Sequence, residues 1–529
     1  MDPLIFCDHA EDLGLPPVHP AEAEAWRSNY ILSDAELQEL RVLHSKALNW
    51  LDHLDVQISW SNTDTILEEL RMQRRLLTLR VANLDSALAP HKRLPGDVLS
   101  EIFAICTDGS VTAFPGSVDS FPWILLMTCR RWNQIALETP TIWRKVSLQY
   151  PVGTRHSAEE YNNFTTLAHK VLARGTRSLE IDMWHPPCIP LLAIGKPIHD
   201  LIHSLANRLT HIHLRCPHEI LVPFLNRSMI HFSALESMQI ELYSEVFAIG
   251  MISRDETLGT FVFSDAPNLH TTVLVKPGTA MYVSPDSLHL PWHRLKSLSF
   301  SGYLTRLSAA RSIFWKCQNL EHCQLEVQPE RNTQAPNRNF IFLRNLRSLV
   351  ITAPPSPPTL LIHLLQPLVT PSLTNLDLRG CPITPDLIDF FDRSNFSLQK
   401  LAATVAIPQL DLEHMLDVLS LSIRNLSLLQ TTFTDSILER ISQGSLLPNI
   451  QRLDCTISSS PVSLQLFTDI MVNRWFPDAE LTPGHCVGHI EQSQPLYPDR
   501  SQWHKATTRF RDVKWKLLER GISIQDSFA

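Results

Sequence analysis

The chain has 529 residues, of which 44% are hydrophobic and 19% charged, and a formal net charge of −8 at pH 7. This length exceeds what one compact core usually holds, so it predicts several domains or a solenoid. The acidic balance argues against a general nucleic-acid binder, and no stretch approaches the ~18 apolar residues of a membrane span. The first residues lack the pattern of a secretory signal, and ten cysteines without paired spacing indicate free thiols. We therefore expect a cytoplasmic or nuclear protein.

Residues 1–32 contain clustered prolines and little periodicity, which predicts a largely disordered lead. Residues 33–90 predict two helices. Ser33 and Glu36 fit a capping box, in which each side chain satisfies the other residue's free backbone N–H.

Apolar residues then follow coiled-coil spacing in two runs, which are Leu37 to Ile58 and Leu67 to Leu88. Their registers do not match, and the break falls at Ser-Asn-Thr-Asp, residues 61–64, which favours a turn. The two helices could pair as a hairpin that packs on the next domain, or across a dimer. His44 and Arg74 occupy core positions and weaken both alternatives.

Residues 91–149 carry the sharpest motif. Leu-Pro at 94–95 opens a short apolar helix, Cys-Arg-Arg-Trp occupies 129–132, and Trp143 closes the region. A unit this small holds more large apolar groups than its own core needs, which implies a partner that covers some of them. A small helical bundle with its own core would require the same residue types, so spacing alone leaves both alternatives open.

This order of residues resembles the F-box, and the preceding helices that run into Arg-Leu-Pro resemble those of fungal, basidiomycete-type F-box proteins. The spacer at 107–122 is longer than in the commonest F-boxes. The resemblance implies binding to a Skp-family adaptor and through it to a cullin–RING ubiquitin ligase. The adaptor-binding residues that it implies are Leu94, Pro95, Val98, Leu99, Ile102, Phe103, Trp123, Leu126, Cys129, Trp132, Ile135 and Trp143.

Residues 150–475 contain an internal repeat with the kernel L-x-x-L-x-L. Its first position falls at 176, 209, 235, 269, 295, 320, 346, 373, 398, 423 and 450, so eight of the ten intervals are 25–27 residues, as in leucine-rich repeats. The inward positions are apolar in 31 of 33 cases, with Thr176 and Thr272 as exceptions, and the alternate positions are mostly polar. This alternation predicts strands with one buried and one solvated face.

One unit, residues 373–391, resembles the cysteine-containing leucine-rich repeats that often follow F-boxes, with Cys381 at the turn. Most other units lack the Asn or Cys that satisfies free backbone groups there. The predicted fold class is therefore α/β: a helical hairpin and F-box, then a leucine-rich-repeat horseshoe with a parallel sheet on its concave face. Residues 476–529 are expected to form a C-terminal cap and tail.

A stacked sheet of this size suits a protein ligand better than a small metabolite. We expect a client to bind its polar face, most strongly along the mixed-charge later half. The candidate residues are His213, Arg215, Asn375, Asp377, Arg379, Lys400, Arg452 and Asp454.

Motifs for catalysis are missing from the sequence: there is no Gly-rich phosphate loop, no G-x-S-x-G and no H-E-x-x-H. His485, Cys486 and His489 lack a second cluster at zinc-finger spacing. We expect no metal, no cofactor and no catalysis by this chain. Two functions remain open: the substrate receptor of an SCF-type (Skp–cullin–F-box) ligase, and a non-degradative scaffold or sensor whose F-box does not assemble a ligase. Contact between the basic residues of 505–520 and nucleic acid is less favoured.

Overall fold

The computed structural model describes residues 32–107, 111–112, 121–149, 166, 168–170, 172–175, 177–182, 200–217, 231–243, 261–263, 266–275, 281–283, 288–328, 330, 340–353, 363–380, 385–404, 407–458, 460–475, 485–490, 500–519 and 524–526. The chain divides into two units, each described by itself below. The helical unit is Met1–Ser147 with Lys170–Thr176, and the sheet unit is Leu148–His169 with Arg177–Ala529. The predicted lead, residues 1–32, lies almost entirely outside the described residues.

The helical unit begins with the two predicted helices, α3 (Asp34–Trp60) and α4 (Asp64–Leu88). The capping box is confirmed: Ser33 Oγ accepts a hydrogen bond from Glu36 N, and Glu36 Oε2 accepts one from Ser33 N at 2.8 Å. The break falls at residues 61–63, within the predicted turn, and Ser61 and Thr63 both have extended backbone angles that end and begin the helices.

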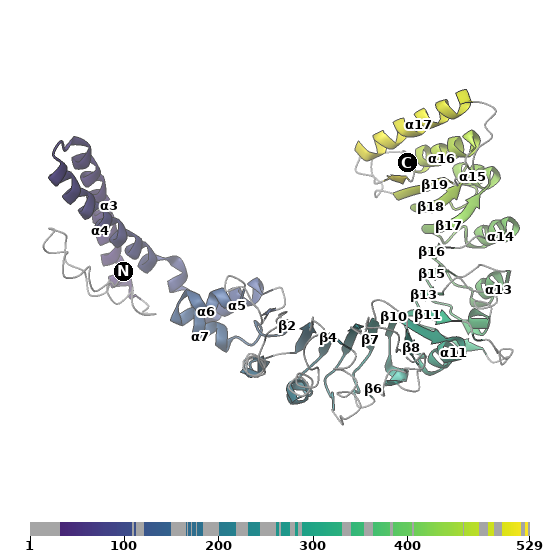
Figure 1. Cartoon of the computed structure of the whole chain (residues 1–529), viewed down its shortest axis with the longest axis horizontal. Coiled ribbons are helices and arrows are strands. Elements are labelled where there is room, and N and C mark those ends of the chain that lie inside the picture. Colours follow the sequence, from purple (N-terminus) through teal and green to yellow (C-terminus); the bar gives the residue numbers. More distant parts are fainter. Residues whose placement is uncertain are drawn as a thin grey trace, which may run out of the picture. The chain divides into compact units, whose positions relative to one another are not determined.

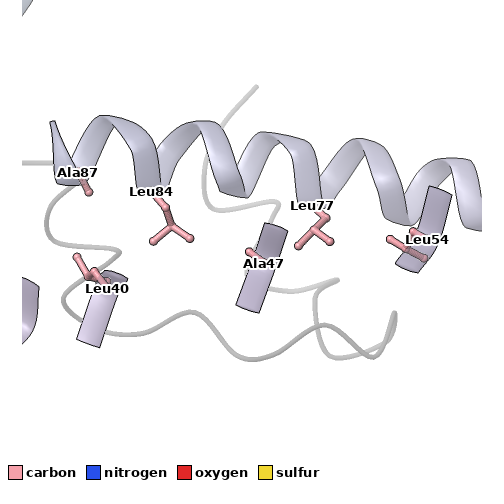
Figure 2. Close-up of a cluster of buried hydrophobic side chains, with 6 residues drawn as sticks. All are labelled: Leu40, Ala47, Leu54, Leu77, Leu84 and Ala87. Atoms are coloured by element: carbon pink, nitrogen blue, oxygen red, sulfur yellow. The ribbon is translucent and has the colours of Figure 1, made fainter. Parts of the chain in front are cut away.

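The two helices pack against each other as a hairpin through a ladder of small and branched apolar side chains (Figure 2). Both polar residues at core positions are paired across it. His44 Nε2 lies 2.8 Å from Asp85 Oδ1, and Arg74 Nε donates to Asp55 Oδ1 at 2.5 Å. The Arg74 side chain is exposed and the His44 side chain is only partly buried, so neither polar residue is enclosed in the core. Within one chain, α3 and α4 pair as a hairpin. Dimerisation through residues 33–90 stays a prediction. The buried cluster consists of Leu40, Ala47, Leu54, Leu77, Leu84 and Ala87.

Short helices follow the hairpin and hold the Leu-Pro and Cys-Arg-Arg-Trp segments. The long spacer contains one short strand, which pairs in parallel with the end of the unit; residues 108–110 and 113–120 lie outside the described part of the chain. The elements are η1 (Pro90–Arg93), α5 (Gly96–Cys106), β1 (Val111–Thr112), α6 (Trp123–Thr128), α7 (Arg130–Glu138) and β2 (Lys145–Gln149).

The sheet unit is built on one parallel sheet whose strand order follows the chain. Each of the eleven predicted kernels lies in a strand of this sheet, in sequence order. Its strands are β3 (Ser178–Asp182), β4 (His211–Pro217), β5 (Ser237–Tyr243), β7 (Thr271–Val275), β10 (Ser297–Arg306), β11 (His322–Gln328), β13 (Ser348–Thr352), β15 (Asn375–Arg379), β16 (Lys400–Ala403), β17 (Asn425–Phe433) and β18 (Arg452–Ile457), with β8 (Met281–Val283) paired to β10.

Burial alternates along the strands as the sequence predicted. Every inward kernel position within the described residues is buried, including Thr272. Leu376 pairs in register with Leu401, and Leu401 with Leu426, so the leucines form continuous rows. Burying a leucine fully contributes about 1.5–3 kcal/mol, and each row buries it against the next repeat. These rows make the unit an α/β, solenoid-like structure.

The turns after the strands are closed by side chains of the next repeat. Thr404 Oγ1 accepts from Gly380 N at 2.9 Å, and Thr431 Oγ1 accepts from Ile407 N at 3.2 Å. Glu326 Oε1 accepts from Gly302 N at 2.7 Å. These bonds satisfy backbone groups that Asn or Cys was expected to satisfy, so threonine and glutamate replace them here. Cys381 lies outside the described residues.

Helices on one side of the sheet cover the inward face (Figure 1). They and the accessory elements are β6 (Phe261–Val262), β9 (Leu288–His289), η3 (Trp292–Arg294), α11 (Leu307–Lys316), β12 (Ile341–Phe342), β14 (Leu368–Val369), α13 (Pro385–Ser394), α14 (Gln409–Leu419), α15 (Asp435–Ser442) and α16 (Pro461–Trp475). Within the described ranges, no helix combines the length and apolar character that a bilayer crossing needs.

The sheet does not end at residue 475, where the repeat pattern ends in the sequence. β19 (His485–Ile490) pairs in parallel with β18, and β20 (Ile524–Asp526) pairs in parallel with β19. Between them lies α17 (Arg500–Glu519), the predicted C-terminal helix, which buries Ala506 and Phe510. Neither added strand has an L-x-x-L-x-L kernel, which is why the sequence placed both in a cap and tail.

We expect Leu84→Ala to destabilise the hairpin by about 2–5 kcal/mol, because Leu84 is fully buried in its core. Leu79→Ala, at an exposed position of the same helix, should leave it nearly unchanged. Hydrogen exchange of the α3 and α4 amides measures the difference locally. Equal protection in both variants would contradict the hairpin packing.

We expect Gly380→Ala to destabilise the sheet unit by about 2 kcal/mol or more. Gly380 has φ +70°, and an added Cβ would lie 2.0 Å from Ala353 O, a rigid backbone atom. Gly96→Ala in the helical unit, where the nearest atom is Ile135 Cδ1 at 3.9 Å, is the control. Thermal unfolding of both variants tests this, and an unshifted melting temperature for Gly380→Ala would refute the turn geometry.

Candidate functional site

The core of the short-helix region is formed by part of the predicted docking set. Leu99, Phe103 and Trp143 are almost completely buried within the helical unit. The Phe103 and Trp132 rings pack edge to face with centroids 5.0 Å apart, and those of Trp123 and Trp143 are 6.0 Å apart. Because Trp143 Nε1 donates to Ala136 O at 2.9 Å, its polar atom is satisfied inside the core.

Hydrogen bonds connect the Leu-Pro and Cys-Arg-Arg-Trp segments directly. Arg131 Nη2 donates to Leu94 O at 2.5 Å, which ties α7 to the start of α5. Cys129 Sγ accepts from Trp132 N at 3.4 Å and caps α7. Asn133 Nδ2 donates to Leu126 O at 2.8 Å and holds α6 against α7. The motif residues thus fix the relative placement of the three helices.

The remaining predicted docking residues lie at or near the surface. Pro95, Val98 and Ile102 are exposed. The half-buried ones are Leu94, Trp123, Leu126, Cys129, Trp132 and Ile135. Residues that fill the core are not available to a partner, so the surface open to one is narrower than the predicted set.

Three exposed apolar residues were missing from the predicted set. Ile105 on α5 is 70% exposed and Met127 on α6 is 66% exposed, and Ile124 lies one helical turn before Met127. Ile105 extends the spacing of Val98 and Ile102, so the three share one stripe of α5. That spacing was available in the sequence, but nothing there distinguished this outer stripe from the inner pair Leu99 and Phe103.

The second candidate surface is the outward face of the sheet, whose earlier half contains ion pairs between neighbouring strands. His213 Nδ1 lies 3.4 Å from Glu180 Oε1, and Arg215 Nε lies 3.5 Å from Glu241 Oε1. At these two places a basic side chain of β4 faces a carboxylate of a neighbouring strand.

In the later half the ion pairs form within single strands. Arg379 Nη2 donates to Asp377 Oδ2 at 2.8 Å, and Arg452 Nη2 lies 3.0 Å from Asp454 Oδ2. The carboxylates are recessed, with side chains 15% and 9% exposed, whereas the guanidinium side chains are 57% and 51% exposed. The hydrogen bond to Asp377, followed by its charge, raises the pKa of Arg379.

Register places small residues between these two pairs. Asp377 pairs with Ala402, Ala402 with Ser427, and Ser427 with Asp454, so one row contains two recessed carboxylates separated by small side chains. Asn375 and Lys400 are adjacent exposed members of the row beside it. The predicted later-half residues are therefore brought together on one face, and they could contact an extended chain.

No three His, Cys, Asp or Glu side chains are placed to hold a metal ion within the parts of the chain that the structure describes. His485, Cys486 and His489 belong to β19. No protein-family model matches the chain, and no curated protein is similar to it.

We expect Phe103→Ala to destabilise the helical unit by about 3–5 kcal/mol, because it empties a buried ring site beside Trp132. Ile102→Ala, one residue away and exposed, should cost under about 0.5 kcal/mol. Hydrogen exchange of α5 and α7 amides reports both effects. Comparable losses of protection would show that the outer stripe is also part of the unit's core.

Proposed function

We propose that this chain is the substrate-recognition subunit of an SCF-type ubiquitin ligase. Its F-box, residues 91–149, docks on a Skp-family adaptor and through it a cullin, and its repeat face binds a protein client. The exposed apolar stripe of α5 carries the proposal, because Val98, Ile102 and Ile105 share one helix face beside a core that Leu99 and Phe103 already fill.

A partner surface is the physical reason for such a stripe. Soluble proteins rarely expose contiguous apolar patches, and rigid helices make better docking elements than loops. The bonds from Arg131 to Leu94 O and from Asn133 to Leu126 O keep α5, α6 and α7 in one arrangement. An adaptor would then find its contacts preformed, which lowers the entropic cost of binding.

The sheet unit is, in this proposal, a leucine-rich-repeat solenoid. Support comes from the 25–27-residue period, the rows of buried leucines, and the threonine bonds at the turns. Such repeats present a long strand surface that suits a polypeptide.

The chain would act by position and not by chemistry. A client on the sheet face is brought near a charged conjugating enzyme that the cullin recruits, which raises the effective concentration of the client's lysine. No catalytic group, metal or cofactor of this chain enters the proposal, and it places the protein in the cytoplasm or nucleus. A non-degradative scaffold, the alternative, differs in recruiting no cullin.

We expect Val98→Asp with Ile102→Asp to abolish co-purification of the Skp-family adaptor, because each buries a carboxylate in an apolar interface. Truncation of central interface residues already costs about 2 kcal/mol or more. Val56→Asp with Leu79→Asp, at exposed apolar positions of the hairpin, is the matched control and should bind normally.

The experiment compares adaptor and cullin recovered with wild type and with both variants from cells that express all partners. Circular dichroism confirms that each variant is folded. Adaptor and cullin lost from the α5 variant alone support the ligase receptor. Adaptor without cullin, from wild type, favours the scaffold, and no adaptor from folded wild type rejects the F-box assignment.

A further inference from the structure

The outward face of the sheet is divided by charge. The residue before each strand is hydrogen-bonded through its backbone to its counterpart in the next repeat, and none of these residues is buried. Together with the outward strand positions, they give β3 to β11 six acidic and four basic residues, a net of −2, and β13 to β18 two acidic and five basic residues, a net of +3. The later part is positive although the whole chain carries −8. We call Arg347, Arg379, Lys400, Arg424 and Arg452, all exposed, the basic strip.

The positive charge of this strip is not cancelled locally. Its two carboxylates, Asp377 and Asp454, are recessed and already paired with Arg379 and Arg452. Arg347, Lys400 and Arg424 make no ion pair with any described residue. The segments outside the described residues between 347 and 458 are Pro-Pro-Ser-Pro-Pro-Thr-Leu-Leu-Ile, Cys-Pro-Ile-Thr and Val-Ala, none of which contains an acid. Asp386, whose side chain is also outside the description, belongs to the helix α13 and not to a strand of the sheet.

Asp454 adds little negative charge to the exposed surface of the strip. It is 6% exposed, its Oδ2 accepts a hydrogen bond from Arg452, and its Oδ1 is buried and out of reach of a ligand on this face. The exposed charges of the strip are therefore its guanidinium and ammonium groups.

We propose that the basic strip binds an extended acidic segment of a polypeptide, rich in Asp or Glu. The five strands β13, β15, β16, β17 and β18 span about 19 Å at the usual strand spacing, which an extended chain covers with about six residues. Ala402 and Ser427 have small side chains, so the backbone of a bound peptide could approach the middle of the row closely. This proposal rests on the proposed function only for calling the segment part of a client.

A polypeptide fits better than a nucleic acid. A nucleic acid carries a negative charge at every nucleotide along its whole length, whereas an acidic peptide segment can be as short as the strip. The acidic half of the same face, β3 to β11, would also repel a long polyanion and limits the favourable contact to a short segment.

The test measures fluorescence anisotropy of the full-length chain with three labelled probes: a peptide of about twelve residues alternating Glu with Gly and Ser, its Gln counterpart, and a single-stranded DNA of equal charge. We expect the Glu peptide to bind at least about tenfold more tightly than the Gln peptide, and more weakly at high salt. Lys400→Glu with Arg424→Glu should weaken it by about tenfold or more. The matched control is Arg41→Glu with Arg75→Glu, exposed hairpin residues with the same change in charge.

Each outcome is decisive for the proposal. Equal affinity for the Glu and Gln peptides, or no loss of affinity in the charge-reversed variant, overturns it. DNA that binds as tightly as the Glu peptide and loses affinity in the same variant would assign the strip to nucleic acid instead. The anisotropy assay contains no adaptor. A negative result would therefore reject the acidic-peptide proposal alone, and the ligase proposal is tested separately by the co-purification experiment.

Discussion

The arrangement of the sheet unit depends on the burial of leucine rows that no single repeat can bury alone. Each strand has one apolar face. That face is removed from water only by the neighbouring strands in register and by the covering helices. Since side chains alternate along a strand, fixing the inward rows also fixes every outward residue. The polar surface is therefore a consequence of the core: Asp377 and Arg379 lie on one face because Leu376 and Leu378 occupy the other.

Because the buried leucine rows hold the repeats together, residues outside these rows can differ from one repeat to the next. Thr404, Thr431 and Glu326 each accept a hydrogen bond from a backbone N–H of the preceding repeat, so residues other than Asn and Cys satisfy these groups. β19 and β20 continue the sheet by parallel pairing although neither has the leucine kernel.

The helical unit follows a different rule, in which a few polar bonds position large apolar groups. Arg131 and Asn133 bind backbone carbonyls of the neighbouring helical segments, and the indole of Trp143 bonds to Ala136 O inside the core. Apolar residues then divide between the inside and outside of one helix: Leu99 and Phe103 are buried, and Val98, Ile102 and Ile105 are not. The outer stripe is held in place because the opposite face of the same helix is the core.

The sequence by itself determined the features that periodicity encodes: the capped helix at Ser33, the break at 61–64, the eleven strands and the alternation of their faces. It determined these because spacing along the chain directly sets which side chains share a face. Only the tertiary structure decided between neighbouring apolar residues such as Ile102 and Phe103, because both stripes of a short helix satisfy the same spacing. It also decided that Asp377 and Asp454 are recessed and paired while Arg347, Lys400 and Arg424 stay open, since pairing depends on distances between side chains that sequence order does not contain.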